Sequence, residues 1–296
     1  MHAVVPATLG LVLLLSACAE RGGTGAAPPV GEPPGTPAQT ATPADSGAPV
    51  LQVAYTGGFV APEMLAVRLP VVSVYANGRV ITEGPVAAVY PGPAWPNVQL
   101  QQADPATVQT LVDHALAAGV GETTDLGTPG IADAPTTRFT VTTATGTTVR
   151  DVYALAEGAS SSSGLTPEQQ AARARLADLF TELTDLPVTL GPQGQATASY
   201  APTAVAALAR QWTAPAGDPS LGDQPELAWP GPALPGEAVG PGLTCVVATG
   251  DQARALQDAA HAANQLTPWR TGDGARWSIG FRPLLPDESS CADLMR

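Results

Sequence analysis

The sequence predicts an α+β fold, with two small antiparallel-sheet-plus-helix units after a disordered N-terminal tether. Three observations predict this class. Segments with alternating apolar residues come in pairs around turn residues, as in hairpins. Other segments carry apolar residues at helical spacing. Gly and Pro gather at residues 18–49 and again at residues 187–199, where neither period continues. We therefore expect an α+β domain at residues 50–187 and a smaller one at residues 200–296.

The composition limits the classes of partner. The 296 residues include 44% hydrophobic residues, enough for a core, but only 13% charged ones. The net charge of −13 opposes binding to a phosphate backbone, so we expect no nucleic-acid partner. The 13 basic residues are all arginine, which excludes lysine-dependent Schiff bases and Walker A phosphate loops. No cofactor is expected.

The first residues have the pattern of an export signal. An apolar run from Leu9 to Leu15 is followed by Ser16, Ala17 and Cys18. The run is shorter than the roughly 20 apolar residues that span a bilayer as a helix. A buried helix with an incidental cysteine is the alternative interpretation. Met1–Thr8 contains no Lys or Arg, which is unusual for a signal peptide, so translation could also start elsewhere.

The four residues Leu15 to Cys18 resemble the lipobox of bacterial lipoproteins. The resemblance implies a signal peptide at 1–17 and a diacylglyceryl group, with palmitate-type chains, on Cys18 as the new N-terminus. It also implies a protein secreted to the extracytoplasmic face of the cell membrane and held there by lipid. Residues 18–49 contain little but Ala, Gly, Pro and Thr, so we expect a disordered tether.

The first domain is expected to begin with strands. Six segments have strand patterns, the last as a weaker candidate: Leu51–Tyr55, Val71–Tyr75, Arg79–Thr82, Thr137–Thr143, Thr147–Leu155 and Val86–Tyr90. Asn77-Gly78 predicts a hairpin with a type I′ turn, because these residues tolerate positive φ. Ala144-Thr145-Gly146 predicts a second hairpin.

Two helices are expected between and after these strands. Asp104 is a good N-cap before Pro105, and Gly119 is a plausible stop. Thr166 and Gln169 have the spacing of a capping box. The apolar stripe of the first helix is Val108, Leu111, Val112, Ala115 and Leu116. The alternation of strands and helices predicts helices on one face of an antiparallel sheet.

The second domain has weaker signals. Ala204–Trp212 fits a strand or a helix, and flanking turn residues favour the strand. Leu243–Ala248 and Arg276–Phe281 are expected strands, and Gly250–Ala263 is an expected helix with an alanine-rich face. Pro215–Gly242 is expected to be irregular.

The cysteines suggest an oxidising compartment. If Cys18 carries lipid, Cys245 and Cys291 remain, and an even remainder in an exported chain favours a disulfide. Two free buried thiols are the alternative. We expect no metal site, since only His114 and His261 could join the cysteines, and both fall at outward positions of expected helices.

Motifs of known catalysis are missing from the sequence, which has no G-x-S-x-G, H-E-x-x-H or C-x-x-C. Gly158 to Ser162 matches the start of a nucleophile elbow but is interpreted as a polar linker. Asp125 and Asp133 flank a Gly-Pro loop without calcium-site spacing.

Acidic residues near the C-terminus allow one catalytic hypothesis. Asp287 and Glu288, with Trp277 nearby in sequence, form a speculative site for a carboxylate-based cell-wall hydrolase. Such enzymes need two carboxyl groups about 5 Å or about 6.5–9.5 Å apart in a cleft. Asp293 belongs to the same acidic cluster. Solvated acids and a core tryptophan are the alternative interpretation.

The chain also resembles a group of lipoproteins of unknown function from high-GC Gram-positive bacteria. The resemblance is carried by the lipobox, Gly57–Val60, Asp133–Phe139 and Arg282–Glu288 with Cys291. The first half is faintly similar to small secreted α+β protease inhibitors. We expect a non-enzymatic envelope protein that binds a protein, peptide or glycan, with the hydrolase as the alternative.

Overall fold

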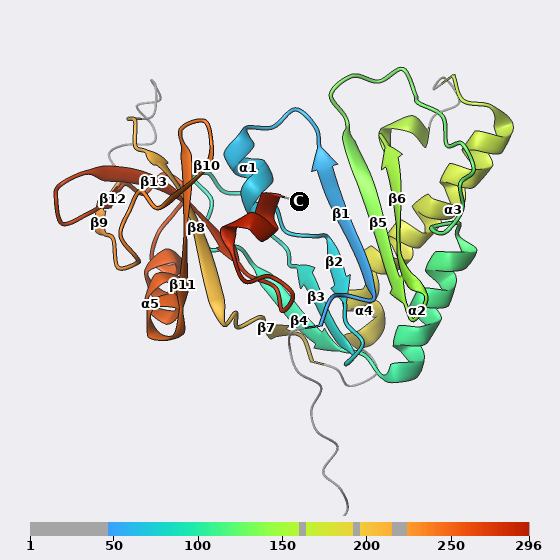
Figure 1. The fold of residues 1–296 in the computed structure, drawn as a ribbon, viewed down its shortest axis with the longest axis horizontal. Coiled ribbons are helices and arrows are strands. Elements are labelled where there is room, and N and C mark those ends of the chain that lie inside the picture. Colours follow the sequence, from blue (N-terminus) through green and yellow to red (C-terminus); the bar gives the residue numbers. More distant parts are fainter. Residues whose placement is uncertain (1–46, 160–163, 192–195, 215–223, 296) are drawn as a thin grey trace, which may run out of the picture. The chain divides into compact units, whose positions relative to one another are not determined.

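A computed structural model describes residues 47–159, 164–191, 196–214 and 224–295. The described residues belong to one compact unit, and they confirm the α+β class, with two sheets and few helices. The expected signal peptide lies outside the described residues, as does the expected tether except for residues 47–49. Figure 1 shows the arrangement of the elements.

The first sheet is antiparallel throughout. Its seven strands run in the order β6 (Gly146–Tyr153), β5 (Pro135–Thr143), β1 (Leu51–Gly57), β2 (Val72–Val74), β3 (Arg79–Glu83), β4 (Val98–Gln102) and β7 (Ala198–Ser199). The β5–β6 hairpin is regular along its whole length, from Thr136 opposite Tyr153 to Thr143 opposite Gly146. The strands of both expected hairpins of this domain are thus confirmed.

Helices cover one face of this sheet (Figure 1): α2 (Pro105–Ala117), α3 (Pro167–Thr184) and α4 (Leu186–Leu190). The side chain of Asp104 accepts hydrogen bonds from the backbone N–H groups of Ala106 and Thr107. Thr166 and Gln169 form the expected capping box. The helices begin where their caps predict because these hydrogen bonds satisfy N–H groups that lack partners within the helix.

The second sheet has six strands, in the order β10 (Glu237–Gly240), β11 (Leu243–Thr249), β8 (Ala204–Gln211), β13 (Arg276–Pro283), β12 (Trp269–Arg270) and β9 (Leu227–Ala228). Only β9 and β12 pair in parallel in the described sheet. Helix α5 (Gly250–His261) packs on one face through Ala253, Leu256 and Ala260. Its small side chains allow close approach to the sheet, beside an aromatic cluster that includes Trp269 and Phe281.

The opposite faces of the two sheets hold further short elements. Helix α1 (Pro62–Val67) and the 3₁₀ turn η4 (Cys291–Met295) lie between the sheets in Figure 1. Ala66 of α1 packs with Leu208 of β8. On the first sheet, Ile81 packs with Leu285, which follows β13. The C-terminal segment therefore joins both sheets. A second 3₁₀ turn, η1 (Glu157–Ala159), follows β6.

Several contacts cross the boundary expected at residues 187–199. β7 extends the first sheet by pairing with β4, and α4 packs into the first core. Pro93 bridges to Asn264, and Trp95 lies in the core of the second sheet.

Four local expectations were wrong. Asn77 does not have positive φ, so the turn is not type I′. The N–H of Gly78 donates to the carbonyl of Tyr75 and closes the turn, and Gly78 itself has φ +85°. Val86–Tyr90 forms no strand. Leu116 is 40% exposed and lies outside the core. The stretch expected to be irregular contains β9 and β10.

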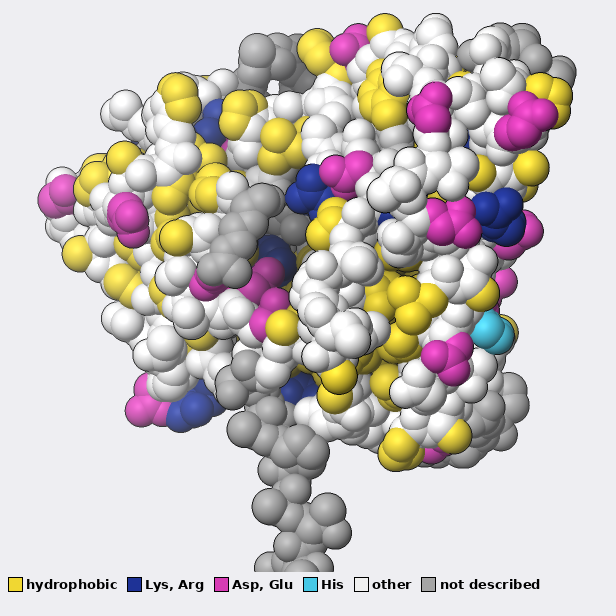
Figure 2. All heavy atoms as spheres, turned by 45° about the vertical axis from the view of Figure 1, so that its right-hand side comes forward, with side chains coloured by type: hydrophobic (Ala, Val, Ile, Leu, Met, Phe, Trp, Pro, Cys, Tyr) yellow, Lys and Arg dark blue, Asp and Glu magenta, His cyan; other side chains and the backbone are white. Residues whose placement is uncertain are grey.

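The surface matches the low charge of the sequence. Figure 2 shows one face on which charged side chains stand singly or in small groups among hydrophobic side chains and uncharged atoms. Among the residues that the structure describes, no helix is both long and apolar enough to cross a membrane.

Candidate functional site

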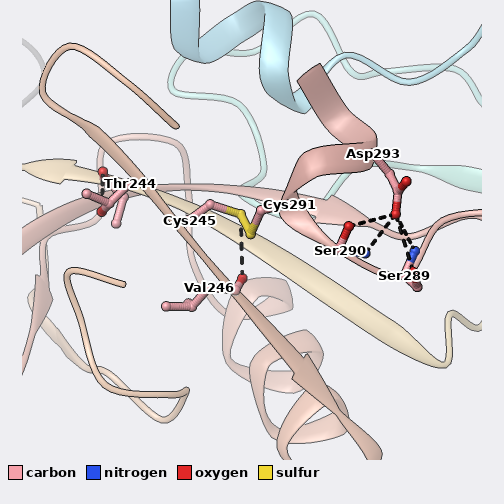
Figure 3. The surroundings of a disulfide bond; sticks show 8 residues. Thr244, Cys245, Val246, Ser289, Ser290, Cys291 and Asp293 are labelled. Atoms are coloured by element: carbon pink, nitrogen blue, oxygen red, sulfur yellow. Dashed lines mark hydrogen bonds between the residues drawn. A yellow bond between two sulfur atoms is a disulfide. The ribbon is translucent and has the colours of Figure 1, made fainter. Parts of the chain in front are cut away.

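The disulfide fixes the segment that carries the predicted acidic site. Cys245 of β11 is bonded to Cys291 at the start of η4, with the two Cα atoms 6.0 Å apart (Figure 3). Both cysteines are buried. Asp293 Oδ2 accepts hydrogen bonds from the backbone N–H groups of Ser289 and Ser290, at 2.9 Å each. The turn that precedes Cys291 is therefore held in one conformation.

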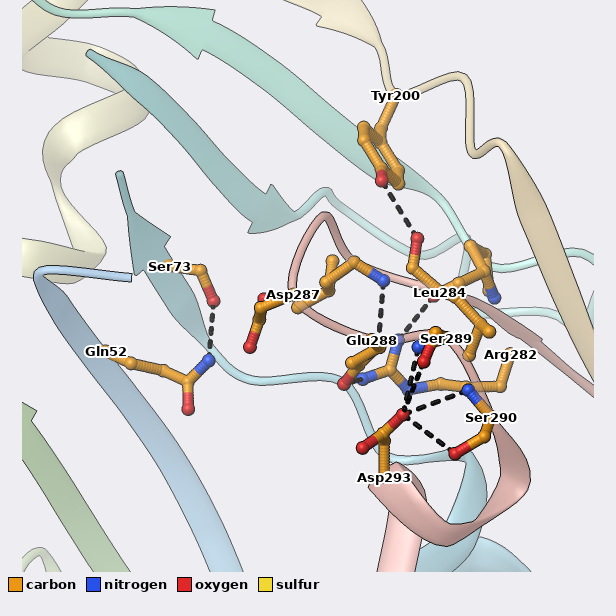
Figure 4. Close-up of polar contacts among 12 residues, drawn as sticks. Gln52, Ser73, Tyr200, Arg282, Leu284, Asp287, Glu288, Ser289, Ser290 and Asp293 are labelled. Carbon is orange, nitrogen blue, oxygen red and sulfur yellow. Dashed lines mark hydrogen bonds and ion pairs between the residues drawn. The ribbon is translucent and has the colours of Figure 1, made fainter. Parts of the chain in front are cut away.

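Arg282 and Glu288 form a buried ion pair within this segment. Arg282 Nη2 donates to Glu288 Oε1 at 2.7 Å, and the side chains are 2% and 12% exposed. Glu288 Oε2 accepts from the backbone N–H of Leu285 at 2.7 Å. Both oxygens of this carboxylate are thus used to close the turn after β13 (Figure 4).

Asp287 turns to different partners. Its Oδ1 accepts a hydrogen bond from the Tyr75 hydroxyl at 2.9 Å, which joins it to the first sheet. Figure 4 shows Asp287 facing the hydrogen-bonded pair of Gln52 and Ser73, away from Arg282. Asp287 therefore attaches the C-terminal segment to Tyr75, whereas Glu288 holds the turn within that segment.

Burial sets the titration of this cluster. It raises the pKa of Glu288, although the charge of Arg282 acts in the opposite direction. It also lowers the pKa of Arg282. Burial raises the pKa of Tyr200, whose hydroxyl donates to the carbonyl of Leu284, to about 12. The pKa of Tyr75 is raised by burial and by Asp287. These groups form a low-dielectric contact layer between the sheets.

The structure does not bring Trp277 to these acids. Trp277 and Phe281 belong to the face of β13 that packs on the core of α5. Arg282 pairs with Ala206 and, by the alternation of a strand, points to the opposite face. The speculative triad of Asp287, Glu288 and Trp277 is therefore split by the sheet.

The remaining candidates stand apart from this cluster. His114 is exposed on α2 and lies 2.8 Å from Glu182 of α3, while His261 is exposed at the end of α5 and contacts the ring of Trp95. Both lie at the surface, as expected. Asp125 and Asp133 are exposed. Gly158 begins a turn whose serines lie outside the described residues.

Two segments of the lipoprotein resemblance meet in space. Gly57 of β1 pairs with Pro135 of β5, and the N–H of Phe59 donates to the carbonyl of Asp133 at 3.2 Å. The third, Arg282–Glu288, forms the buried cluster described above. The first two segments are thus joined through their backbones, and the third is held by side-chain contacts.

Sequence reasoning missed Tyr75, Tyr200 and Arg173. Tyr75 and Tyr200 lie in segments with ordinary strand and loop patterns, so the neighbouring residues in the sequence do not indicate their contacts. Arg173 had a detectable signal, since it stands at helical spacing from Leu176 and Phe180, where an apolar residue is expected.

Within the described residues, no three His, Cys, Asp or Glu side chains are placed to hold a metal ion. Comparisons of the chain with protein-family models, with curated proteins and with solved structures give no match.

Proposed function

We propose that this chain is an exported lipoprotein, held by lipid on Cys18 at the outer face of the cell membrane, where it binds a protein or peptide. The observation that carries the proposal is the Cys245–Cys291 bond. A buried disulfide in a chain of ordinary size is typical of an oxidising compartment. The bond uses two of the three cysteines of the sequence, and Cys18 is the third.

The contacts of the acidic residues favour binding over hydrolysis. Glu288 uses both carboxylate oxygens within the turn, and Asp287 is bonded to Tyr75. A general acid or nucleophile must instead reach a substrate in a cleft. Asp287 attaches the C-terminal segment to Tyr75 of the first domain, and Glu288 closes the turn after β13.

Exposed apolar side chains supply a surface for a partner. Phe59, Met64 and Leu65 lie within seven residues at and before α1, and they are 86%, 56% and 39% exposed. Large apolar side chains exposed close together in the chain are candidates for an interaction site, because apolar exposure is unfavourable in water. Aromatic residues and methionine are enriched in such interfaces.

The first experiment tests the anchor. We expect Cys18→Ser to appear in the soluble fraction and Cys291→Ser, which keeps Cys18, to stay with the membranes. A diacyl anchor has two chains, each contributing about 0.8 kcal/mol per buried CH₂, so its loss releases the protein. A Cys18→Ser protein that stays in the membrane would contradict the proposal.

The second experiment tests the binding surface by crosslinking on intact cells. Phe59→Ser should lose a crosslinked partner that Val188→Ser, a control at another exposed apolar side chain (73% exposed), retains. Equal crosslinking in both variants would show that this surface is not used.

A further inference from the structure

Arg173 of α3 is a buried cation that holds two loops to the helix. It is 4% exposed. Its Nη2 donates to the carbonyls of Tyr153 and Ala154 at 2.7 and 2.6 Å, and its Nη1 lies 3.5 Å from the carbonyl of Leu126. Ala154 has φ +49°, a conformation that alanine rarely adopts. The guanidinium therefore stabilises a turn that the sequence alone would not favour.

These contacts leave the charge of Arg173 without a direct ion-pair partner among the described residues. Its Nε has no hydrogen-bond partner. In the described part of the chain no carboxylate forms an ion pair with it, whereas Arg282, the other deeply buried arginine, is paired with Glu288. Glu157 acts on it electrostatically but is exposed. A buried charge without a direct ion-pair partner is costly, and burial lowers the pKa of Arg173, although the charge of Glu157 acts in the opposite direction.

A small cavity lies beside this guanidinium. Its volume is about 90 Å³, and Arg173 and Gln170 line it with Leu155, Gly158, Ala159 and Ala174. A Cβ on Gly158 would lie 2.8 Å from Arg173 Nη2, so only glycine lets the turn approach so closely. A water needs roughly 10–15 Å³ of such space. The cavity is therefore large enough for a few waters or one small organic ion.

We propose that this cavity binds a small carboxylate, supplied either as a free acid or as the carboxyl end of a peptide, which pairs with Arg173. A carboxylate would supply the direct ion pair that the carbonyls of Leu126, Tyr153 and Ala154 do not give Arg173, and charge-assisted hydrogen bonds are about twice as strong as neutral ones. Leu155, Ala159 and Ala174 offer an apolar wall for a methyl-sized substituent.

Two alanines of α3 allow a matched test. Ala174 is exposed at the rim of the cavity, so Ala174→Leu fills its entrance without touching the contacts of Arg173. Ala171 is exposed on the same helix but does not line the cavity, so Ala171→Leu is the control. Arg173→Met removes the charge and keeps the length of the side chain.

The probe is acetate, which replaces chloride at constant ionic strength. Binding is measured from the thermal midpoint of unfolding and by isothermal titration calorimetry. We expect saturable acetate binding in the wild type and in Ala171→Leu, with an affinity at least ten times lower in Ala174→Leu and Arg173→Met. An Ala-Ala dipeptide and its C-terminal amide separate the two sources. Tighter binding of the free dipeptide than of acetate identifies a peptide end, and the reverse identifies a free acid.

Three results would overturn the proposal. The first is that neither acetate nor the dipeptide has a saturable effect on the wild type. The second is that Ala174→Leu binds them as well as the wild type does. The third is that the wild type binds chloride as tightly as acetate, which would mark a site for any small anion. Because Ala174→Leu retains the buried guanidinium, the test remains decisive even if Arg173→Met does not fold.

Discussion

Arg282 donates to Glu288 at 2.7 Å inside the molecule, and neither side chain has more than 12% of its surface exposed. The pair closes the turn that leads from the second sheet to the disulfide. Removing one partner leaves the other charge buried and unpaired, which typically costs about 3–5 kcal/mol.

We therefore expect Glu288→Ala to lose about 3–5 kcal/mol of unfolding free energy in urea denaturation. The double variant Arg282→Met with Glu288→Leu should recover much of this loss, because it buries no charge. Asp151→Ala, which breaks an exposed pair with Arg138, is the control and should lose no more than about 1 kcal/mol. A double variant as unstable as Glu288→Ala would contradict this explanation.

The same residue should give stability a dependence on pH. Burial raises the pKa of Glu288 above its usual 4.5, so the folded protein holds that proton more tightly than the unfolded chain. The resulting stability is complete below pH 4.5 and is lost as the pH rises through the raised pKa. Over this window the unfolding free energy of the wild type should fall relative to that of Glu288→Gln. If urea denaturation gives unfolding free energies that change with pH in the same way for the wild type and for Glu288→Gln, the pH dependence does not come from Glu288.

The disulfide should contribute strongly to stability. Cys245 and Cys291 are 46 residues apart in sequence, and closing such a loop is worth about 4 kcal/mol in the chain-entropy model. We expect the double variant Cys245→Ala with Cys291→Ala to lose stability on this scale in urea denaturation. A loss below about 1 kcal/mol would mean that the unfolded chain is already compact there.

The capping box of α3 gives a smaller expected effect. Thr166→Ala removes the hydroxyl that accepts from the N–H of Gln169, which should cost about 1 kcal/mol. Thr181→Ala, inside the same helix, removes only a bond to the carbonyl of Ala177 and serves as the control. Thermal midpoints of the two variants check the difference, and equal midpoints would contradict the role of the cap.

Elements with local signals were predictable from the sequence. The caps at Asp104 and Thr166 and the pairing of β5 with β6 depend on residues close in the chain. The two-residue strands β7 and β9 were not predictable, because their only evidence is the partner strand beside them. Asn77-Gly78 marked a hairpin correctly but the wrong turn, since only its glycine adopts positive φ.

The candidate site was harder to predict for the same reason. Asp287 and Glu288 are conspicuous in the sequence, but their partners decide what they do. The hydrogen bond from Tyr75 to Asp287 spans 212 residues, and no local pattern announces it. Trp277 looked close to the acids along the chain, but the alternation of β13 places it on the other face of the sheet.

The position of Trp95 has a consequence for how the molecule unfolds. Its backbone belongs to the connection between β3 and β4, yet its ring contacts Phe281 in the core beside α5. Unfolding of the first sheet would remove the Trp95 ring from the second core. The unfolding free energies of the two sheets are therefore coupled. We therefore expect a single cooperative unfolding transition, with the same midpoint by tryptophan fluorescence and by circular dichroism.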